Sequence, residues 1–304
     1  GPILTSPDGI TWTERTSGIS ASLRGVTYGN GLFVTVSLRG TIHTSPDGIT
    51  WTEKTSGISE SLIGVTYGNG LFVTVGLGGT ILTSSDRVTW TSRTSGTSNS
   101  LYGVTYGNGI FVTVGVSGII ITSPDVTTWT ERTSGTSKYL YEVTYGNGLF
   151  VTVGNSGTIL TSSDGNSWTR IIFVKSVDLL GVTYGNGLFV VVGENGTIFT
   201  SSDGNSWTNK RTSSGTSEYL VGVTYGNGIF VTVGENGTIL TSSDGTTWTE
   251  RTPWNSNSLV GVTYGNGLFV TVGEDGYANE TIFSSSDGNS WTNKRTSSGT
   301  SEYL

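Results

Sequence analysis

The sequence predicts an all-β protein, a β-propeller of four-stranded antiparallel blades with about 39 residues in each repeat. Two repeated motifs carry this prediction. Tyr-Gly-Asn-Gly recurs seven times from Tyr28 onward, and Ser-x-Asp-Gly-x-x-Trp or a close variant recurs eight times, ending at Trp291. A period near 40 residues is typical of propeller blades and of helical arrays. Short segments rich in β-branched and aromatic residues, separated by turn residues and without a helical stripe, favour strands.

One unit, residues 222–251, shows the expected order of elements. Strand a covers 222–226, strand b covers 229–233, and Asn227-Gly228 joins them. This pair suits a type I′ hairpin, in which both central residues have positive φ. Strands c (238–242) and d (247–251) follow, and we expect Asn-Gly and Asp-Gly pairs to turn the chain in the same way. The a–b and c–d turns then share one face of the ring, and the b–c and d–a loops share the other.

The aspartate of the second motif is interpreted as a turn residue, and the tryptophan as a residue that packs across the neighbouring blade. A carboxylate can accept N–H bonds from the hairpin backbone, and an indole buries a large area. Arg87 and Val126 replace glycine after two of the aspartates, so we expect less tight hairpins there. The residues given these structural roles are Asp8, Trp12, Asp47, Trp51, Asp86, Trp90, Asp125, Trp129, Asp164, Trp168, Asp203, Trp207, Asp244, Trp248, Asp287 and Trp291.

These turns resemble a shortened form of the Asp-box of sialidase-type (BNR) propellers. The units are also similar to the repeats of photosystem II assembly-factor-like propellers and of highly repetitive bacterial surface propellers. The resemblance covers essentially the whole chain and implies the fold only, because no catalytic residue of a sialidase can be carried over. From it we expect a segment of a longer bacterial protein that is secreted or displayed on the cell surface.

Seven strand-a segments predict a ring of seven blades, with eight as the alternative. We expect one domain, 1–304, in which residues 1–24 form half a blade and the N-terminal c–d hairpin (3–16) completes the blade that begins at Gly261. The C-terminal hairpin (281–296) is then left over, or it displaces the N-terminal one. The displaced hairpin could pair with another chain and cause self-association. The repeats are 25–63, 64–102, 103–141, 142–180, 181–221, 222–260 and 261–304.

Composition argues against several classes of function. The net charge of −7 argues against nucleic acid as a partner, because phosphate binding needs a basic surface. The chain has no cysteine and a single histidine, which excludes thiol chemistry and a histidine-rich metal site. No apolar run approaches the roughly 18 residues of a membrane span. We expect no cofactor and no metal.

The candidate site lies where the repeat varies. The b–c and d–a loops differ among units, and the residue that enters strand a should ring the mouth of the central channel. The variation favours a binding face on an invariant scaffold, although drift in unconstrained loops remains an alternative. The candidate ligand-binding residues are Arg24, Tyr102, Tyr139, Tyr141, Glu194, Tyr219, Glu235, Trp254, Glu274 and Tyr277.

We interpret the chain as a non-enzymatic binding or display module, with glycans or another protein as the partner, bound weakly and at several points. A purely structural array without a ligand is the alternative. A glycosidase-like enzyme is the third hypothesis, and it is the weakest. Glu194, Glu235 and Glu274 repeat at one blade position, which does not suit an acid/base pair. His43 replaces an apolar residue of strand c and is interpreted as a tolerated substitution.

Overall fold

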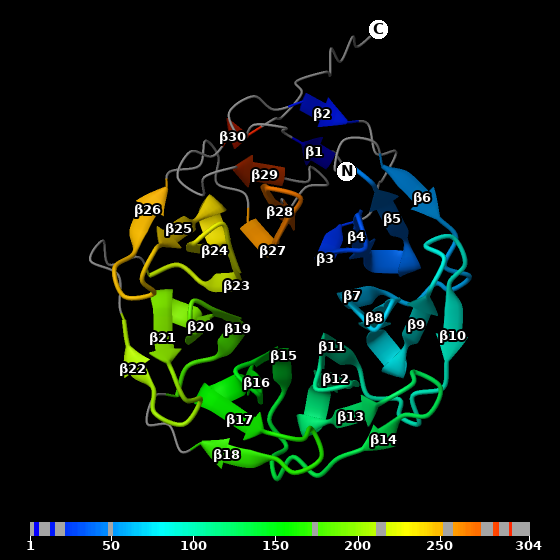
Figure 1. Ribbon diagram of the computed structural model, residues 1–304, viewed down its shortest axis with the longest axis horizontal. Helices are drawn as coiled ribbons and strands as arrows, with labels where there is room; N and C mark the ends of the chain where they lie inside the picture. Colours follow the sequence, from blue (N-terminus) through cyan, green and yellow to red (C-terminus); the bar gives the residue numbers. More distant parts are fainter. Residues whose placement is uncertain are drawn as a thin grey trace, which may run out of the picture.

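The computed structural model describes residues 3–5, 13–15, 22–47, 51–171, 176–210, 217–251, 258–274, 282–285 and 292–293. Of these, residues 3–5, 13–15, 274, 282–285 and 292–293 are described by their backbone alone. The chain forms a ring of antiparallel sheets around a central channel (Figure 1). Each sheet is a meander in which strands consecutive in the sequence pair with one another.

Seven long inner strands line the channel, and a second strand pairs with each of them. The inner strands are β3 (Leu23–Gly29), β7 (Leu62–Gly68), β11 (Leu101–Gly107), β15 (Leu140–Gly146), β19 (Leu179–Gly185), β23 (Leu220–Gly226) and β27 (Ser258–Gly265). Their partners are β4 (Leu32–Ser37), β8 (Leu71–Gly76), β12 (Ile110–Gly115), β16 (Leu149–Gly154), β20 (Leu188–Gly193), β24 (Ile229–Gly234) and β28 (Leu268–Glu274).

The outer strands are shorter. The third strands are β5 (Ile42–Ser45), β9 (Ile81–Ser84), β13 (Ile120–Ser123), β17 (Thr158–Ser162), β21 (Thr197–Ser201), β25 (Ile239–Ser242) and β29 (Ile282–Ser285). The fourth strands are β6 (Thr52–Lys54), β10 (Thr91–Arg93), β14 (Thr130–Glu131), β18 (Thr169–Ile171), β22 (Thr208–Asn209), β26 (Thr249–Arg251) and β30 (Thr292–Asn293).

In the six sheets from β3 to β26, the second and third strands are joined by single 3₁₀ turns whose middle residue has positive φ. This residue is Asn195 or Asn236 in two blades, with φ of 55° and 51°. The connection is therefore a 3₁₀ turn, in place of the expected two-residue hairpin. The turns are η1 (Leu38–Gly40), η2 (Leu77–Gly79), η3 (Val116–Gly118), η4 (Asn155–Gly157), η5 (Glu194–Gly196) and η6 (Glu235–Gly237).

The predicted uniform ring of seven blades, or of eight, is wrong. Six blades, from β3 to β26, are complete, with the side chains of all four strands described. At the closure of the ring lies the sheet β27–β30, whose two outer strands are described by backbone alone. A separate two-stranded sheet, formed by β1 (Ile3–Thr5) and β2 (Thr13–Arg15), lies beside it, and β1 contacts β29 (Figure 1). The C-terminal hairpin thus pairs with β28, and the N-terminal hairpin does not complete this sheet as predicted.

The Tyr-Gly-Asn-Gly motif makes the contact between neighbouring blades. Each tyrosine packs on the buried phenylalanine of its own blade, with ring centroids 4.6–4.7 Å apart. The ring of the next blade's tyrosine covers the glycine that follows, so a Cβ on that glycine would lie 2.1–2.3 Å from a ring carbon. The series closes on itself, because Gly265 lies under Tyr28. Glycine is needed here for close approach, while Asn-Gly supplies the hairpin.

The aspartate of each described c–d turn from Asp86 to Asp244 acts as a backbone acceptor. In the β17–β18 turn, Asp164 Oδ1 accepts N–H bonds from Asn166 and Ser167 at 2.8 and 2.9 Å, and a bond from the Ser162 hydroxyl at 3.0 Å. The bonds from the two amides are the main cause that lowers the pKa of this carboxyl. The same bonds form at Asp86 and Asp125, so these hairpins keep their turn despite the missing glycine.

The two turns without glycine differ from the others in the hydrogen bond of the tryptophan indole. The indoles of Trp168, Trp207 and Trp248 donate to the carbonyl of the turn glycine at 3.0–3.1 Å. In the two variant turns, the buried indole nitrogens of Trp90 and Trp129 have no acceptor among the described residues.

Replacing Arg87 by glycine is expected to stabilise the protein by about 1 kcal/mol, because Arg87 is exposed and held at φ 68° in the left-handed region. Urea unfolding followed by tryptophan fluorescence measures the change. Val126→Gly is the comparison, since Val126 has φ 60° but is buried, so this variant loses packing and should gain less. A lower midpoint for Arg87→Gly than for the unchanged chain would contradict this account of the turn.

Candidate functional site

A β-bulge at the start of every inner strand turns one side chain toward the channel. The pairing register shifts at this place in all seven inner strands, for example between Leu140 and Glu142 in β15. Bulges re-aim side chains at sheet ends. The residues aimed in this way are those expected at the channel mouth: Arg24, Ile63, Tyr102, Tyr141, Leu180, Val221 and Val260, and all of them line one cavity.

This cavity is the channel itself, with a volume of about 260 Å³. The bulge residues form its mouth. Below them, glycines of five inner strands and Glu142 of β15 contribute to its wall, together with valines such as Val104 and Val182. The glycines keep the wall thin, because neighbouring inner strands approach closely there. A Cβ on Gly64, for example, would lie 2.3 Å from the carbonyl oxygen of Tyr102.

Two tyrosines of adjacent blades form an aromatic pair at the mouth. Tyr102 and Tyr141 are half-buried, and their rings are stacked with centroids 5.9 Å apart and planes inclined by 27°. Burial raises the pKa of both phenols. The Tyr141 hydroxyl accepts a bond of 2.8 Å from Asn155 Nδ2, which fixes the ring. The pair offers a flat, partly dry contact surface.

An acidic network continues from this pair around the mouth. Asn155 Nδ2 also donates to Asp178 Oδ2 at 2.5 Å, and the Ser156 amide donates to Asp178 Oδ1 at 2.9 Å. The Asp178 amide in turn donates to Glu194 Oε2 at 3.1 Å. Glu194 lies beside Tyr219, where its charge is the largest cause that raises the pKa of that phenol. Side chains from β11, from β15 and from the β16–β17, β18–β19, β20–β21 and β22–β23 connections thus form one patch.

The structure brings some of the predicted site residues together and not others. Tyr102, Tyr141, Glu194 and Tyr219 belong to the patch, and Tyr219 is exposed over 38% of its surface. Arg24 lines the channel mouth from β3, and Glu235 begins η6 near Tyr219. Tyr139 is exposed and borders the patch, because its carbonyl accepts a bond of 2.9 Å from the Asn155 amide. Glu274 is described by backbone alone, and Trp254 and Tyr277 lie outside the described residues.

Glu142 was not among the site residues predicted from the sequence. It occupies the channel-wall position that is glycine in β3, β7, β11, β19, β23 and β27, and Tyr-Glu-Val stands where the other units read x-Gly-Val. Aligning the units column by column would have revealed it. Desolvation inside the ring raises the pKa of this carboxyl to about 7, against the opposing effect of an N–H bond from Val143. Asn155 and Asp178, which fix the patch, were also missed as site residues.

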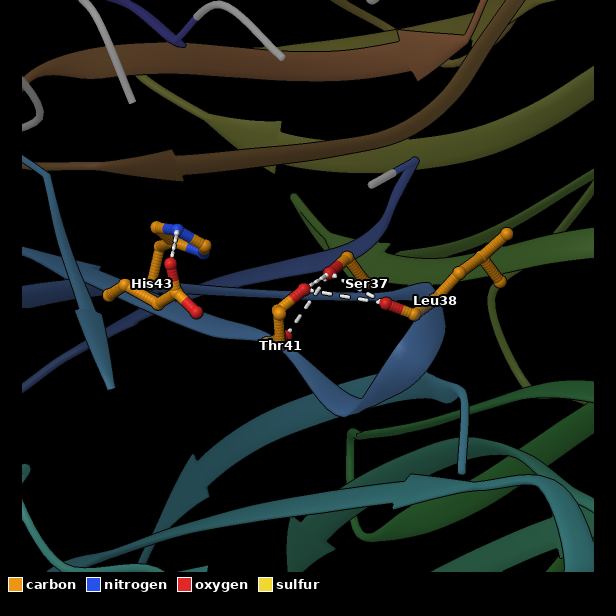
Figure 2. A network of polar contacts seen from close by, with 5 residues as sticks. Ser37, Leu38, Thr41 and His43 are labelled. Carbon is orange, nitrogen blue, oxygen red and sulfur yellow. Dashed lines mark hydrogen bonds and ion pairs between the residues drawn. The ribbon is translucent and has the colours of Figure 1, made fainter. Parts of the chain in front are cut away.

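His43 lies apart from this patch, in the third strand of its blade (Figure 2). Its side chain is fully buried, and neither ring nitrogen has a hydrogen-bond partner among the described residues. Glu53 Oε2 approaches Nε2 only to 3.8 Å and is more than half exposed, and burial lowers the pKa of the histidine to about 4. The nearby Ser37 and Thr41 hydroxyls bond each other and the Leu38 carbonyl instead. His43 therefore replaces a core residue and is not placed for catalysis.

Replacing His43 by leucine, the residue of β9, β17 and β25 at this position, is expected to stabilise the protein and to change its pH response. Between pH 6.5 and about 4 the unfolded histidine binds a proton that the folded one excludes, so the natural chain loses stability as the pH falls through this window. Urea midpoints at pH 7 and pH 4.5 measure the loss. The leucine variant should lose less, and an equal loss in both proteins would contradict the burial argument.

The described residues contain no group of three or more His, Cys, Asp or Glu side chains that could hold a metal ion. No helix among them is long and apolar enough to cross a membrane.

The sequence matches the model of the "DUF6242 beta propeller domain" over residues 103–220 and again over 182–304. No curated protein matches it.

Three solved structures illustrate the fold. YCF48 from Cyanidioschyzon merolae is 14% identical with a TM-score of 0.69, covering 94% of this chain and 97% of that one. A structure of YCF48 bound to D1 peptide is 16% identical with a TM-score of 0.71, covering 90% and 96%. The WD40 propeller domain of Doa1 is 16% identical with a TM-score of 0.63, covering 88% and 91%. These likenesses support the comparison with assembly-factor-like propellers, whereas the Asp-box relationship and the bacterial origin stay predictions.

Proposed function

Since this chain belongs to the family of DUF6242 beta propeller domains, we propose that it is a non-enzymatic binding module whose channel-mouth face takes a peptide segment of a protein partner. The observation that carries the proposal is the patch of Tyr102, Tyr141, Asp178, Glu194 and Tyr219, which spans several blades and breaks the repeat. Support also comes from the YCF48 structure with a D1 peptide, because a propeller of similar fold has a peptide as its ligand there.

The chemistry of the patch indicates which peptide it would suit. Stacked tyrosine rings bind apolar and aromatic side chains and attract cations over their faces. Asp178 and Glu194 add negative charge beside them, and Glu218, which accepts a bond from Asn236, extends it. A segment with lysine or arginine among apolar residues is therefore the best match. A positively charged partner also complements the net charge of −7.

Selection from a phage-displayed library of random 12-residue peptides on the full chain tests the proposal. We expect selected peptides to be rich in Lys or Arg and to bind at the mouth, so Tyr102→Ala with Tyr141→Ala should weaken them at least tenfold. The melting temperature should change little, because both rings are only half-buried. Val88→Ala is the matched control, since Val88 is 62% exposed in a c–d turn on the opposite face.

Two outcomes would overturn the proposal. One is that no peptide binds the natural chain better than it binds the double variant. The other is that a glycan array gives specific ligands while the peptide selection gives none, which would favour the glycan hypothesis drawn from the sequence. Neither the geometry nor the structures named above point to a glycan. A double variant that binds normally but melts far lower would show that the tyrosines only pack.

A further inference from the structure

Glu142 places one carboxylate inside the channel, where the wall below the mouth is otherwise lined by glycines and valines. It lies in β15, directly below the Tyr102–Tyr141 pair in sequence register, and contributes to the wall of the same cavity. The carboxylate rests against the neighbouring strand, because a Cβ on Gly103 would lie 2.8 Å from Glu142 Oε1. A side chain at this position in one blade of the ring makes the channel asymmetric.

The carboxylate has few groups to balance its charge. Glu142 Oε1 accepts a bond of 2.9 Å from the Val143 amide of its own strand. Among the described residues none forms an ion pair with it, and no neighbouring charge contributes to the shift of its pKa, which burial alone drives upward. The titratable groups that share the cavity are the two tyrosines and Arg24, which enters from β3. An anionic group held in this way is stabilised by a cation that enters from solvent.

The surroundings also select the shape of that cation. Val104, Val182 and Val223 line the cavity and suit an aliphatic stem, while the tyrosine faces at the mouth favour a positive charge passing them. The cavity volume of about 260 Å³ is several times the roughly 30 Å³ that one water molecule occupies, so one butyl-sized group fits in the channel. Asp178 and Glu194 beside the mouth raise the local concentration of cations.

We propose that the channel binds one alkylammonium or guanidinium group, with the Glu142 carboxylate as its counter-ion beneath the Tyr102–Tyr141 pair. A Lys or Arg side chain of a bound peptide can supply this group, in which case the inference rests on the proposed function. A free small amine has the same chemistry. Binding favours the ionised carboxylate, so it releases a proton wherever Glu142 is protonated in the absence of the cation.

Isothermal titration of the full chain with n-butylammonium chloride tests the carboxylate, and n-butanol is the neutral control. Glu142→Gln should weaken the amine at least tenfold and leave butanol unaffected. The matched variant is Glu131→Gln, an exposed carboxylate of β14, which should bind like the natural chain. With a pKa of about 7, the ionised fraction of Glu142 rises about tenfold between pH 6 and 8, so the affinity should rise by the same factor and only when Glu142 is present.

The peptide acetyl-Ala-Ala-Lys-Ala-Ala-amide, and its analogue with norleucine in place of lysine, distinguish the two sources. If the lysine peptide binds, the norleucine peptide and butylammonium do not, and Glu142→Gln abolishes the binding, a peptide side chain is the source of the cation. If butylammonium and the lysine peptide both bind, the site accepts the cation from either source. Butylammonium binding without any peptide binding supports the inference while removing the proposed function. Peptides that bind equally to the natural chain and to Glu142→Gln, with no amine binding, overturn the inference and leave the proposed function standing.

Discussion

Replacing Gly226 by alanine is expected to destabilise the propeller by about 3 kcal/mol. The new Cβ would lie 2.1 Å from Cγ of Tyr264 in the next blade, a distance that two carbon atoms cannot adopt. Tyr264 cannot move away freely, because its ring packs on Phe269, which is fully buried. Overpacking of this kind typically costs 1–3 kcal/mol and more where the backbone must move. Urea unfolding of the full chain measures the change.

Gly222→Ala in the same strand is the control. Gly222 also has an ordinary backbone conformation, but its Cβ would meet nothing closer than the Val233 side chain at 3.3 Å. We expect this variant to stay within about 1 kcal/mol of the natural chain. Similar losses in both variants would show that glycine is required along the whole inner strand and that the tyrosine contact has no special role.

Replacing Glu142 by glutamine is expected to stabilise the protein by about 2–3 kcal/mol at pH 8, and hardly at all at pH 4. The folded pKa of about 7 lies above the ordinary value of 4.5, so between these values the unfolded chain releases a proton that the folded chain keeps. Stability therefore falls as the pH rises through this window, at about 1.36 kcal/mol per pH unit. Glutamine keeps the shape without the charge. Urea midpoints from pH 4 to pH 8 measure the difference.

Glu131→Gln, at an exposed position of β14, serves as the control and should follow the natural chain at every pH. The turn aspartates do not obscure the comparison. Backbone N–H bonds lower the pKa values of Asp86 and Asp203 to about 2, so their effect on stability appears only in more acidic solution. If the stability of the natural chain and that of Glu142→Gln changed in parallel between pH 5 and 8, Glu142 would be as well solvated in the folded protein as in the unfolded chain.

The order of strands in each blade could be predicted because local chemistry decides it. Asn227 and Gly228 have φ of 47° and 81°, which is what an Asn-Gly hairpin requires. The number of blades could not be predicted in the same way. The terminal hairpins carry the same motif, so local sequence does not distinguish them, and the pairing of β28 with β29 follows the connection within the chain.

The place of the candidate residues in the ring could be predicted from the sequence, but several of their neighbours could not. The residue entering strand a reaches the channel mouth, as the ring geometry predicts, because a bulge aims it there. The contact between Asn155 and Asp178 forms because two loops lie side by side in the folded chain, and no sequence motif predicts it. Glu142 is visible in the sequence as a break in a glycine column, but its burial emerges only once seven inner strands enclose it.

The most direct test of the account compares the natural chain with one in which the site is returned to the repeat, Tyr102→Val with Tyr141→Val and Glu142→Gly. Each new residue already occupies the equivalent position in other blades, so the fold should persist and melt at or above the natural temperature. The measurement is the affinity of both proteins for peptides selected on the natural chain. The account predicts at least a tenfold loss in the regularised chain. Equal affinity would contradict it, because binding would then belong to the repeat itself and not to the residues that break it.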